Sequence, residues 1–169
     1  MKISCIVIGL CACSAISFTS LARAGEAETS LTFVKGLGIN ANFGQMVRFG
    51  AVRMQTYRNV VCIVGSSDAK QLVEQELLPA IAKYQPQWDK NLAAVWMQLL
   101  TEVEMQSLLD LKRQSPYVSK YQVAGPKAGA AMMSSSSDIL QNALSEGMNR
   151  AWSKASAEHS VNPAVPCKS

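Results

Sequence analysis

The chain has 169 residues and a net charge of +4. Apolar residues make up 49% of the chain and charged residues 17%, a balance typical of a folded globular protein. The basic residues are scattered among acidic ones and form no concentrated basic stripe of the kind that binds phosphate backbones. We therefore expect no nucleic-acid partner.

The chain begins with the three-part pattern of a secretory signal peptide. Lys2 supplies a positive charge, residues 3–21 carry none, and small residues stand at Ala22 and Ala24, the two positions that a signal peptidase recognises. This pattern predicts cleavage between Ala24 and Gly25 and export to the periplasm or the medium.

Two alternatives use the same segment. It could remain as a membrane anchor, although it is diluted by polar residues and ends in a cleavage site. A lipoprotein modified at Cys13 is the other alternative, but the apolar stretch continues past Cys13 through Ile16 and Phe18. After removal of the signal peptide, no stretch is apolar and long enough to span a membrane.

Cleavage leaves two of the five cysteines, Cys62 and Cys167. Two cysteines in an exported chain indicate one disulfide. The mature chain lacks a C-x-x-C motif, so the sequence gives no reason to expect redox catalysis. By closing a loop of about 105 residues, this bond would contribute roughly 4 to 5 kcal/mol in the chain-entropy model. The alternative is two free thiols, with Cys62 buried in the apolar segment 60–64.

Helical spacing of apolar residues recurs after the signal peptide. One face predicts a long helix over residues 42–64, with a short strand over residues 60–64 as the alternative. That face comprises Phe43, Met46, Val47, Gly50 and Met54. Gly65 is expected to end this helix and the polar residues 66–68 to cap the next one. Within that next helix, Pro79 is expected to cause a kink and Pro86 to mark a boundary.

The clearest helical face follows this boundary. It comprises Trp88, Leu92, Val95, Trp96 and Leu99. Thr101 and Glu104 then have the spacing of a capping box, which starts a helix that Ser115 and Pro116 close. Residues 123–137 are either a loop or a helix that begins after Pro126. Ser135 and Asp138 are candidates to cap the last helix.

These segments predict an all-α protein, a compact bundle of about five or six helices stapled by one disulfide. Short connections imply mostly antiparallel neighbours. The expected organisation is a signal peptide (1–24), a single helical domain (25–158) and a proline-containing C-terminal tail (159–169).

Residues suited to catalysis are few. His159 is the only histidine and lies beside the tail, whereas a catalytic base needs a rigidly held position and zinc needs several ligands. Five carboxylates remain as a pool for acid–base chemistry: Glu74, Glu76, Asp89, Glu102 and Glu104. The two close pairs among them have i, i+2 spacing, which places them on different helix faces. We expect no catalytic site, metal or cofactor.

Large apolar side chains suggest a second kind of site. Trp88, Trp96 and Trp152 are expected to fill the core between helices. Met132 and Met133 flank a stretch of small residues and could line a groove for an apolar partner.

Residues 88–117, "WDKNLAAVWMQLLTEVEMQSLLDLKRQSPY", resemble an exported bacterial family, domain of unknown function 2059. Its members are similar in having an apolar helix, a Thr/Ser-capped helix, a Ser-Pro pair and a further long helix. The matching positions are Leu99, Leu100, Thr101, Glu104, Met105, Leu108, Leu109, Ser115 and Pro116, and the segment to Trp152 fits loosely.

The chain departs from that family at two places. The family has an aromatic pair where this chain has Leu111 and Lys112, and glycine-lysine where it has Tyr117 and Val118. The resemblance implies a helical exported domain and transfers no catalytic residue.

The sequence therefore favours an exported, non-catalytic helical protein that binds an envelope partner, as an inhibitor, an immunity factor or an assembly accessory. One alternative is an envelope hydrolase that uses two carboxylates facing one cleft. Another is a carrier with an internal cavity for an apolar ligand.

Overall fold

The structure is a computed structural model that describes residues 18–158 of the chain. Within that range it contains six α-helices, two short 3-10 turns and no strand, which confirms the predicted all-α class. The elements are α1 (Phe18–Gly36), η1 (Ile39–Ala41), α2 (Asn42–Ala51), α3 (Gln55–Val64), α4 (Ser66–Leu99), α5 (Glu102–Leu111), η2 (Lys112–Gln114) and α6 (Val118–Glu158).

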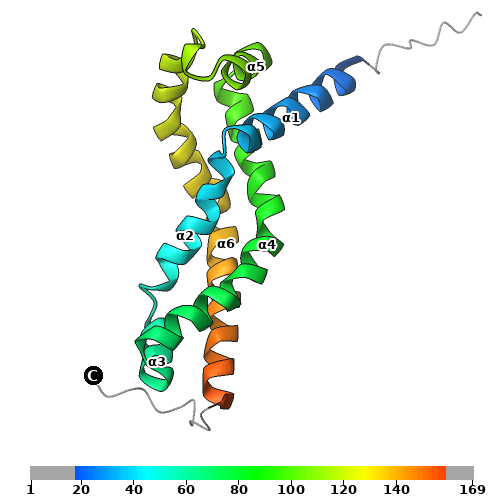
Figure 1. Cartoon of the computed structure of the whole chain (residues 1–169). Helices are drawn as coiled ribbons and strands as arrows, with labels where there is room; N and C mark the ends of the chain where they lie inside the picture. Colours follow the sequence, from blue (N-terminus) through cyan, green and yellow to red (C-terminus); the bar gives the residue numbers. More distant parts are fainter. Residues whose placement is uncertain (1–17, 159–169) are drawn as a thin grey trace, which may run out of the picture.

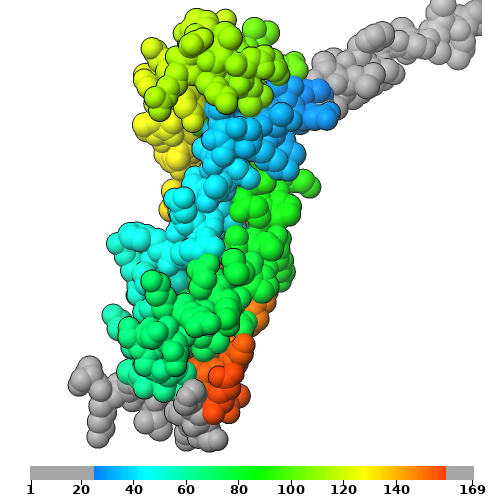
Figure 2. Space-filling model, viewed as in Figure 1, coloured from blue at the N-terminus to red at the C-terminus, as the bar shows by residue number. Residues whose placement is uncertain are grey.

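The two longest helices, α4 and α6, form the spine of the molecule. Early on α4, Glu76 reaches Arg150 of α6, whereas Asn91, later on α4, donates to Ser136, earlier on α6. The two helices are therefore antiparallel, as predicted for neighbours in the bundle. At 1.5 Å per residue, the 41 residues of α6 extend about 60 Å. The bundle is elongated as a result, with α5 at one end and α3 at the other (Figures 1 and 2).

Stacked aromatic rings fix the shorter helices to this spine. Phe43 of α2 stacks on Trp88 of α4, with ring centroids 4.9 Å apart. Phe33 of α1 meets the edge of Trp96 of α4 at 5.7 Å, and Tyr121 of α6 stacks on the same tryptophan at 5.1 Å. The predicted core positions of Trp88 and Trp96 are confirmed, since each is 2% exposed.

The predicted single helix over residues 42–64 is wrong, because α2 ends at Ala51 and α3 begins at Gln55. The amide of Met54 donates to the carbonyl of Ala51, three residues earlier, and Met54 itself has an extended backbone (φ −73°, ψ 147°). This tight turn redirects the chain while Ala51 and Val60 stay fully buried on either side of it. The strand alternative for residues 60–64 is also wrong, since they are helical.

Gly65 ends α3 as predicted, with a positive φ of 85° that favours glycine. The expected side-chain cap from residues 66–68 is absent, because Gly65 itself is the N-cap of α4 and no side-chain hydrogen bond is made there. The capping box of α5 is confirmed. Thr101 Oγ1 accepts from the amide of Glu104 at 3.4 Å, and Glu104 Oε2 accepts from the amide of Thr101 at 2.8 Å.

The predicted boundary at Pro86 is wrong, because α4 continues through both Pro79 and Pro86. Each proline removes one helical amide donor. Both prolines are exposed, and so are Gln75 and Ala82, the residues four positions earlier whose carbonyls lose their helical partners. Water can satisfy those carbonyls. Figure 1 shows that α4 bends along its length, as expected for a helix that contains prolines.

Residues 123–137 are helical, and the helix begins before them at Val118. The predicted helix start at Ser135 and Asp138 is wrong, because α6 passes through both. A stripe of small and flexible side chains at four-residue steps explains this continuity: Ala124, Ala128, Met132 and Ser136 are all buried. Burial of that stripe against the other helices holds a segment whose local sequence specifies little.

Cys62 is exposed on α3, so the alternative that buried a free Cys62 thiol in the core is wrong. Cys13, His159 and Cys167 lie outside the described residues, and the disulfide and the lipoprotein alternative stay predictions. The predicted cleavage point, Ala24–Gly25, falls within α1 and also stays a prediction. Among the described residues, none of the helices has the length and apolar character needed to cross a bilayer.

Candidate functional site

Glu74 and Glu76, the first close pair of the carboxylate pool, point to different helices. Glu74 Oε1 accepts from Nε of Arg48 on α2 at 2.8 Å. Glu76 lies 3.7 Å from Nε of Arg150 and 3.4 Å from Nζ of Lys154, both on α6. The predicted divergence of this pair is confirmed. Each carboxylate ties α4 to a different neighbour.

The second pair, Glu102 and Glu104, diverges in the same way. Glu102 accepts from the hydroxyl of Thr29 on α1 at 2.8 Å, whereas Glu104 accepts from Nζ of Lys120 on α6 at 2.6 Å. The hydrogen bond from Lys120 lowers the pKa of Glu104, and the amide of Thr101 in the capping box acts in the same direction.

Asp89, the fifth carboxylate, is 4% exposed. It accepts from Nε2 of Gln85 at 2.6 Å and from Nδ2 of Asn40 at 3.4 Å. Gln85 Nε2 also donates to the Asn40 carbonyl at 3.1 Å, so the three residues join η1 to α4. A buried carboxylate needs such donors, and these bonds give Asp89 a structural role.

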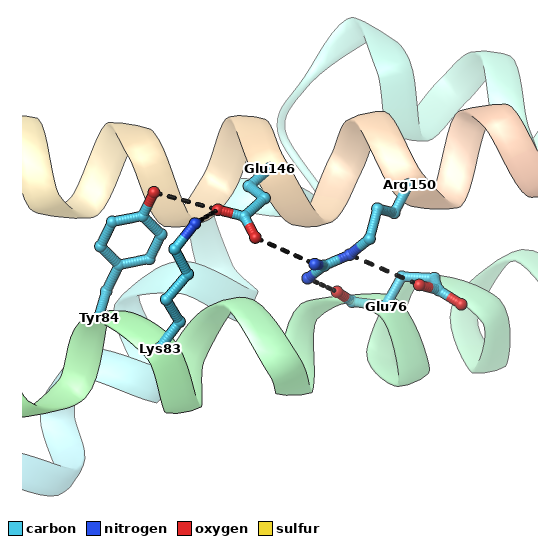
Figure 3. Close-up of polar contacts among 5 residues, drawn as sticks. All are labelled: Glu76, Lys83, Tyr84, Glu146 and Arg150. Atoms are coloured by element: carbon cyan, nitrogen blue, oxygen red, sulfur yellow. Dashed lines mark hydrogen bonds and ion pairs between the residues drawn. The ribbon is translucent and has the colours of Figure 1, made fainter.

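A polar network between α4 and α6 is centred on Glu146 (Figure 3). One carboxylate oxygen accepts from Lys83 Nζ at 2.7 Å and from Tyr84 Oη at 3.0 Å, and the other accepts from Arg150 Nη1 at 3.0 Å. Arg150 Nη2 also donates to the Glu76 backbone carbonyl at 3.0 Å. These contacts fix the register of α4 against α6.

This network predicts a pH dependence of stability. The hydrogen bond from Lys83 is the main reason that the pKa of Glu146 lies below its ordinary value of 4.5. A lowered pKa in the folded state contributes stability above the ordinary value, and that contribution disappears as the pH falls through the lowered one. Urea unfolding from about pH 7 to about pH 3 should therefore show Glu146→Gln less stable than the parent near neutrality, with the two curves converging below about pH 4.5.

Lys83→Met is the matched variant, because it removes the donor and lets the pKa of Glu146 return towards its ordinary value. Its stability curve should converge with that of the parent over the same acidic range. Parallel curves at all pH values would show that Glu146 contributes no pH-linked stability.

An apolar groove lies on α5. This helix is at one end of the bundle (Figure 1). Val103 is 70% exposed, the highest value among the large apolar side chains of the described residues, and Leu111 is 49% exposed. The groove has a volume of about 560 Å³. We call this region the α5 surface; it is lined by Glu102, Val103, Gln106, Ser107, Asp110 and Leu111.

Lys112, directly after this surface, has the strained backbone angles φ 49° and ψ −116°. These angles match the first central residue of a type II′ turn, which glycine normally occupies. Strain of this kind costs of order 1 to 3 kcal/mol and is concentrated at functional sites. The sequence prediction missed both features. For the groove, the sequence did contain a signal: Val103 and Leu111 are apolar but do not belong to the buried face of α5, which contains Met105 and Leu108.

A second groove, of about 770 Å³, lies along α3 at the other end of the bundle. We call it the α3 groove; it is lined by Val52, Gln55, Tyr57, Arg58, Asn59, Val61, Cys62 and Ser66. Gln55, Arg58 and Cys62 follow one another at helical spacing and are all exposed. Cys62 therefore lies at an accessible position in the groove, in line with two polar side chains and beside apolar ones.

The alternative of a groove lined by Met132 and Met133 is not supported, because Met132 is buried in the core and Met133 is 55% exposed. Two other methionines, Met97 and Met105, line a pocket of about 300 Å³ that Glu26 and Glu102 also border. Its volume is at the lower limit for small-molecule sites. Residues 18–158 contain no cluster of three His, Cys, Asp or Glu side chains that could hold a metal ion.

The fold and these surfaces define a small all-α bundle with a groove at each end. Comparison with protein-family models, with curated proteins and with solved structures finds no match. The resemblance to family 2059 therefore stays a prediction, and the function has to be argued from the geometry of the chain.

Proposed function

We propose that the protein is exported, is not an enzyme, and acts by binding another envelope protein through the α5 surface. The exposure of Val103 carries this proposal. Val103 is 70% exposed and shares one groove with the exposed Leu111, so the two side chains offer a partner protein an apolar contact.

The polar residues around the groove indicate the kind of partner. Glu102, Gln106 and Asp110 surround Val103 and Leu111, and Lys112 and Arg113 follow in the turn. An apolar centre with a polar rim of both charge signs resembles a protein–protein interface. An inhibitor, an immunity factor or an assembly accessory would each use such a surface.

The remaining carboxylates support a non-catalytic role. Glu74, Glu76 and Glu104 are bound by cationic side chains, and Asp89 is buried under two amide donors. A hydrolase needs two carboxylates directed at one substrate bond. In this chain, these carboxylates instead bind side chains on neighbouring elements and so hold the bundle together.

Site-directed photocrosslinking tests the proposal. A photoreactive amino acid at Val103, in the full chain expressed in its own cells, should give one discrete protein adduct. The same amino acid at Ser145, an exposed position on α6, is the control and should not give that adduct. Sequencing the amino terminus of the purified protein checks export, and the terminus is expected at Gly25.

Identical adducts at both positions, or none at Val103, would contradict the α5 surface as a binding site. A lipid adduct at Val103 in place of a protein would favour the carrier alternative, and a glycan adduct would favour the hydrolase alternative. A Val103→Asp substitution in an otherwise unlabelled chain should weaken co-purification of the identified partner at least about 10-fold, since it places a charge at the centre of the interface.

A further inference from the structure

We infer that residues 159–167 of the chain itself occupy the α3 groove and are fastened there by a disulfide between Cys167 and Cys62. This inference concerns the end of the bundle opposite the α5 surface and does not depend on partner binding there, but it rests on the export included in the proposed function. Three observations carry it: the shape of the groove, the point where α6 ends, and the chemistry of the segment that follows.

The groove presents apolar walls around an accessible thiol. Val52, Tyr57 and Val61 contribute apolar surface, and Cys62 lies among them with its side chain exposed. Only α3 and the residues beside it form the lining. A segment that lies over this groove and turns back along α3 would therefore cover Val52 and Val61 and still reach the thiol.

The last described residue of α6 lies close to this groove. Glu158 and Lys154 share a pocket of about 230 Å³ with Val64, two residues after Cys62. Cys167 is nine positions after Glu158, so the chain between them can span up to about 30 Å, whereas the ten residues of α3 extend only about 15 Å. The segment can thus lie over the groove and still bring the two Cα atoms within the roughly 7 Å that a disulfide requires.

The composition of the segment suits this groove. Val161, Ala164 and Val165 can cover the apolar walls of the groove. Pro163 and Pro166 have no amide hydrogen, so their backbones need no hydrogen-bond acceptor. This suits a helix face, which has no strand edge to supply one. The fixed φ of each proline also reduces the conformational entropy that the segment loses on docking.

Disulfide formation requires a partner that accepts electrons, and a disulfide oxidant of the export compartment fills this role. One thiolate of the pair attacks the oxidant disulfide, which gives a mixed disulfide and one oxidant thiolate. The second thiolate then attacks the protein sulfur of the mixed disulfide and displaces the other oxidant thiolate. Two electrons and the two thiol protons end on the oxidant, and one S–S bond forms in the protein.

Two measurements on the full exported chain test the inference. Peptide mapping without reduction should find Cys62 linked to Cys167 within one chain. Docking is then measured without the bond, in a Cys167→Ser variant, as the rate at which iodoacetamide alkylates Cys62. Adding Val161→Asp and Val165→Asp should raise that rate about 10-fold, since charged side chains disfavour the apolar walls.

Both variants carry the same Cys62 thiol, so its intrinsic reactivity is held constant. Val123→Asp, at an exposed position three residues after Lys120, which binds Glu104 of α5, is the matched control and should leave the rate unchanged. Equal alkylation rates with and without the two aspartates would overturn docking. Two unlinked thiols, or a dimer joined through Cys62 of two copies, would overturn the linkage.

Discussion

Replacing Phe33 by alanine is expected to lower the free energy of unfolding by about 3 to 5 kcal/mol. Phe33 is fully buried, and its ring lies 5.7 Å from that of Trp96 and 6.1 Å from that of Tyr121. The substitution removes apolar contacts from α1, α4 and α6 together and leaves a cavity between them. Edge-to-face ring contacts add about 0.5 to 1.5 kcal/mol per pair beyond burial.

Urea denaturation followed by circular dichroism measures this loss, and Phe49→Ala is the matched control. Phe49 is 58% exposed, and the guanidinium carbon of Arg53 lies 3.4 Å from its ring centroid. The control should cost less than about 1 kcal/mol, the usual range for an exposed cation–π contact. Equal losses in both variants would show that the aromatic cluster does not anchor α1.

Replacing Gly147 by alanine is expected to destabilise the protein by about 1 to 2 kcal/mol, although alanine normally favours a helix over glycine. An added Cβ would lie 2.6 Å from Cδ2 of Leu77, 3.1 Å from its Cα and 3.3 Å from the carbonyl oxygen of Glu76. The Leu77 side chain can move, but the two backbone atoms can give way only if α4 moves away from α6. That displacement would disturb the Glu146 network in Figure 3.

Gly129→Ala, in the same helix, should have the opposite sign. Nothing lies within 4 Å of the Cβ that would be added there, so only the helix preference for alanine operates. The expected gain is about 0.5 to 1 kcal/mol. Thermal or urea unfolding of the two variants measures the difference directly. Stabilisation by Gly147→Ala would contradict the close approach of α4 and α6.

Features that depend on neighbours in the chain could be predicted from the sequence. The capping box of Thr101 and Glu104 uses contacts three residues apart, and Gly65 ends α3 through its own backbone freedom. The buried positions of Trp88 and Trp96 follow from their helical spacing, because an apolar face repeats with the turn of its own helix. Each of these features is set within about one or two helical turns.

Other features were decided by contacts between helices that are distant in sequence. The chain turns between Ala51 and Gln55, yet α4 stays helical through Pro79 and Pro86, where the local signal predicts a break. α6 is likewise continuous through the weakly specified residues 123–137. Local preferences are worth about 1 kcal/mol per residue, or about 3 for proline, so burial of a long apolar stripe can override them.

The candidate sites belong to this second group. The spacing of Val103, Leu111 and Cys62 shows that each lies on a helix, but not whether another helix covers it. In the tertiary structure, α5 and α3 lie at opposite ends of the bundle, where few elements surround them, so these side chains stay exposed. Exposure depends on which helix faces pack together in the tertiary structure. The spacing of apolar residues at three or four positions does not determine that packing.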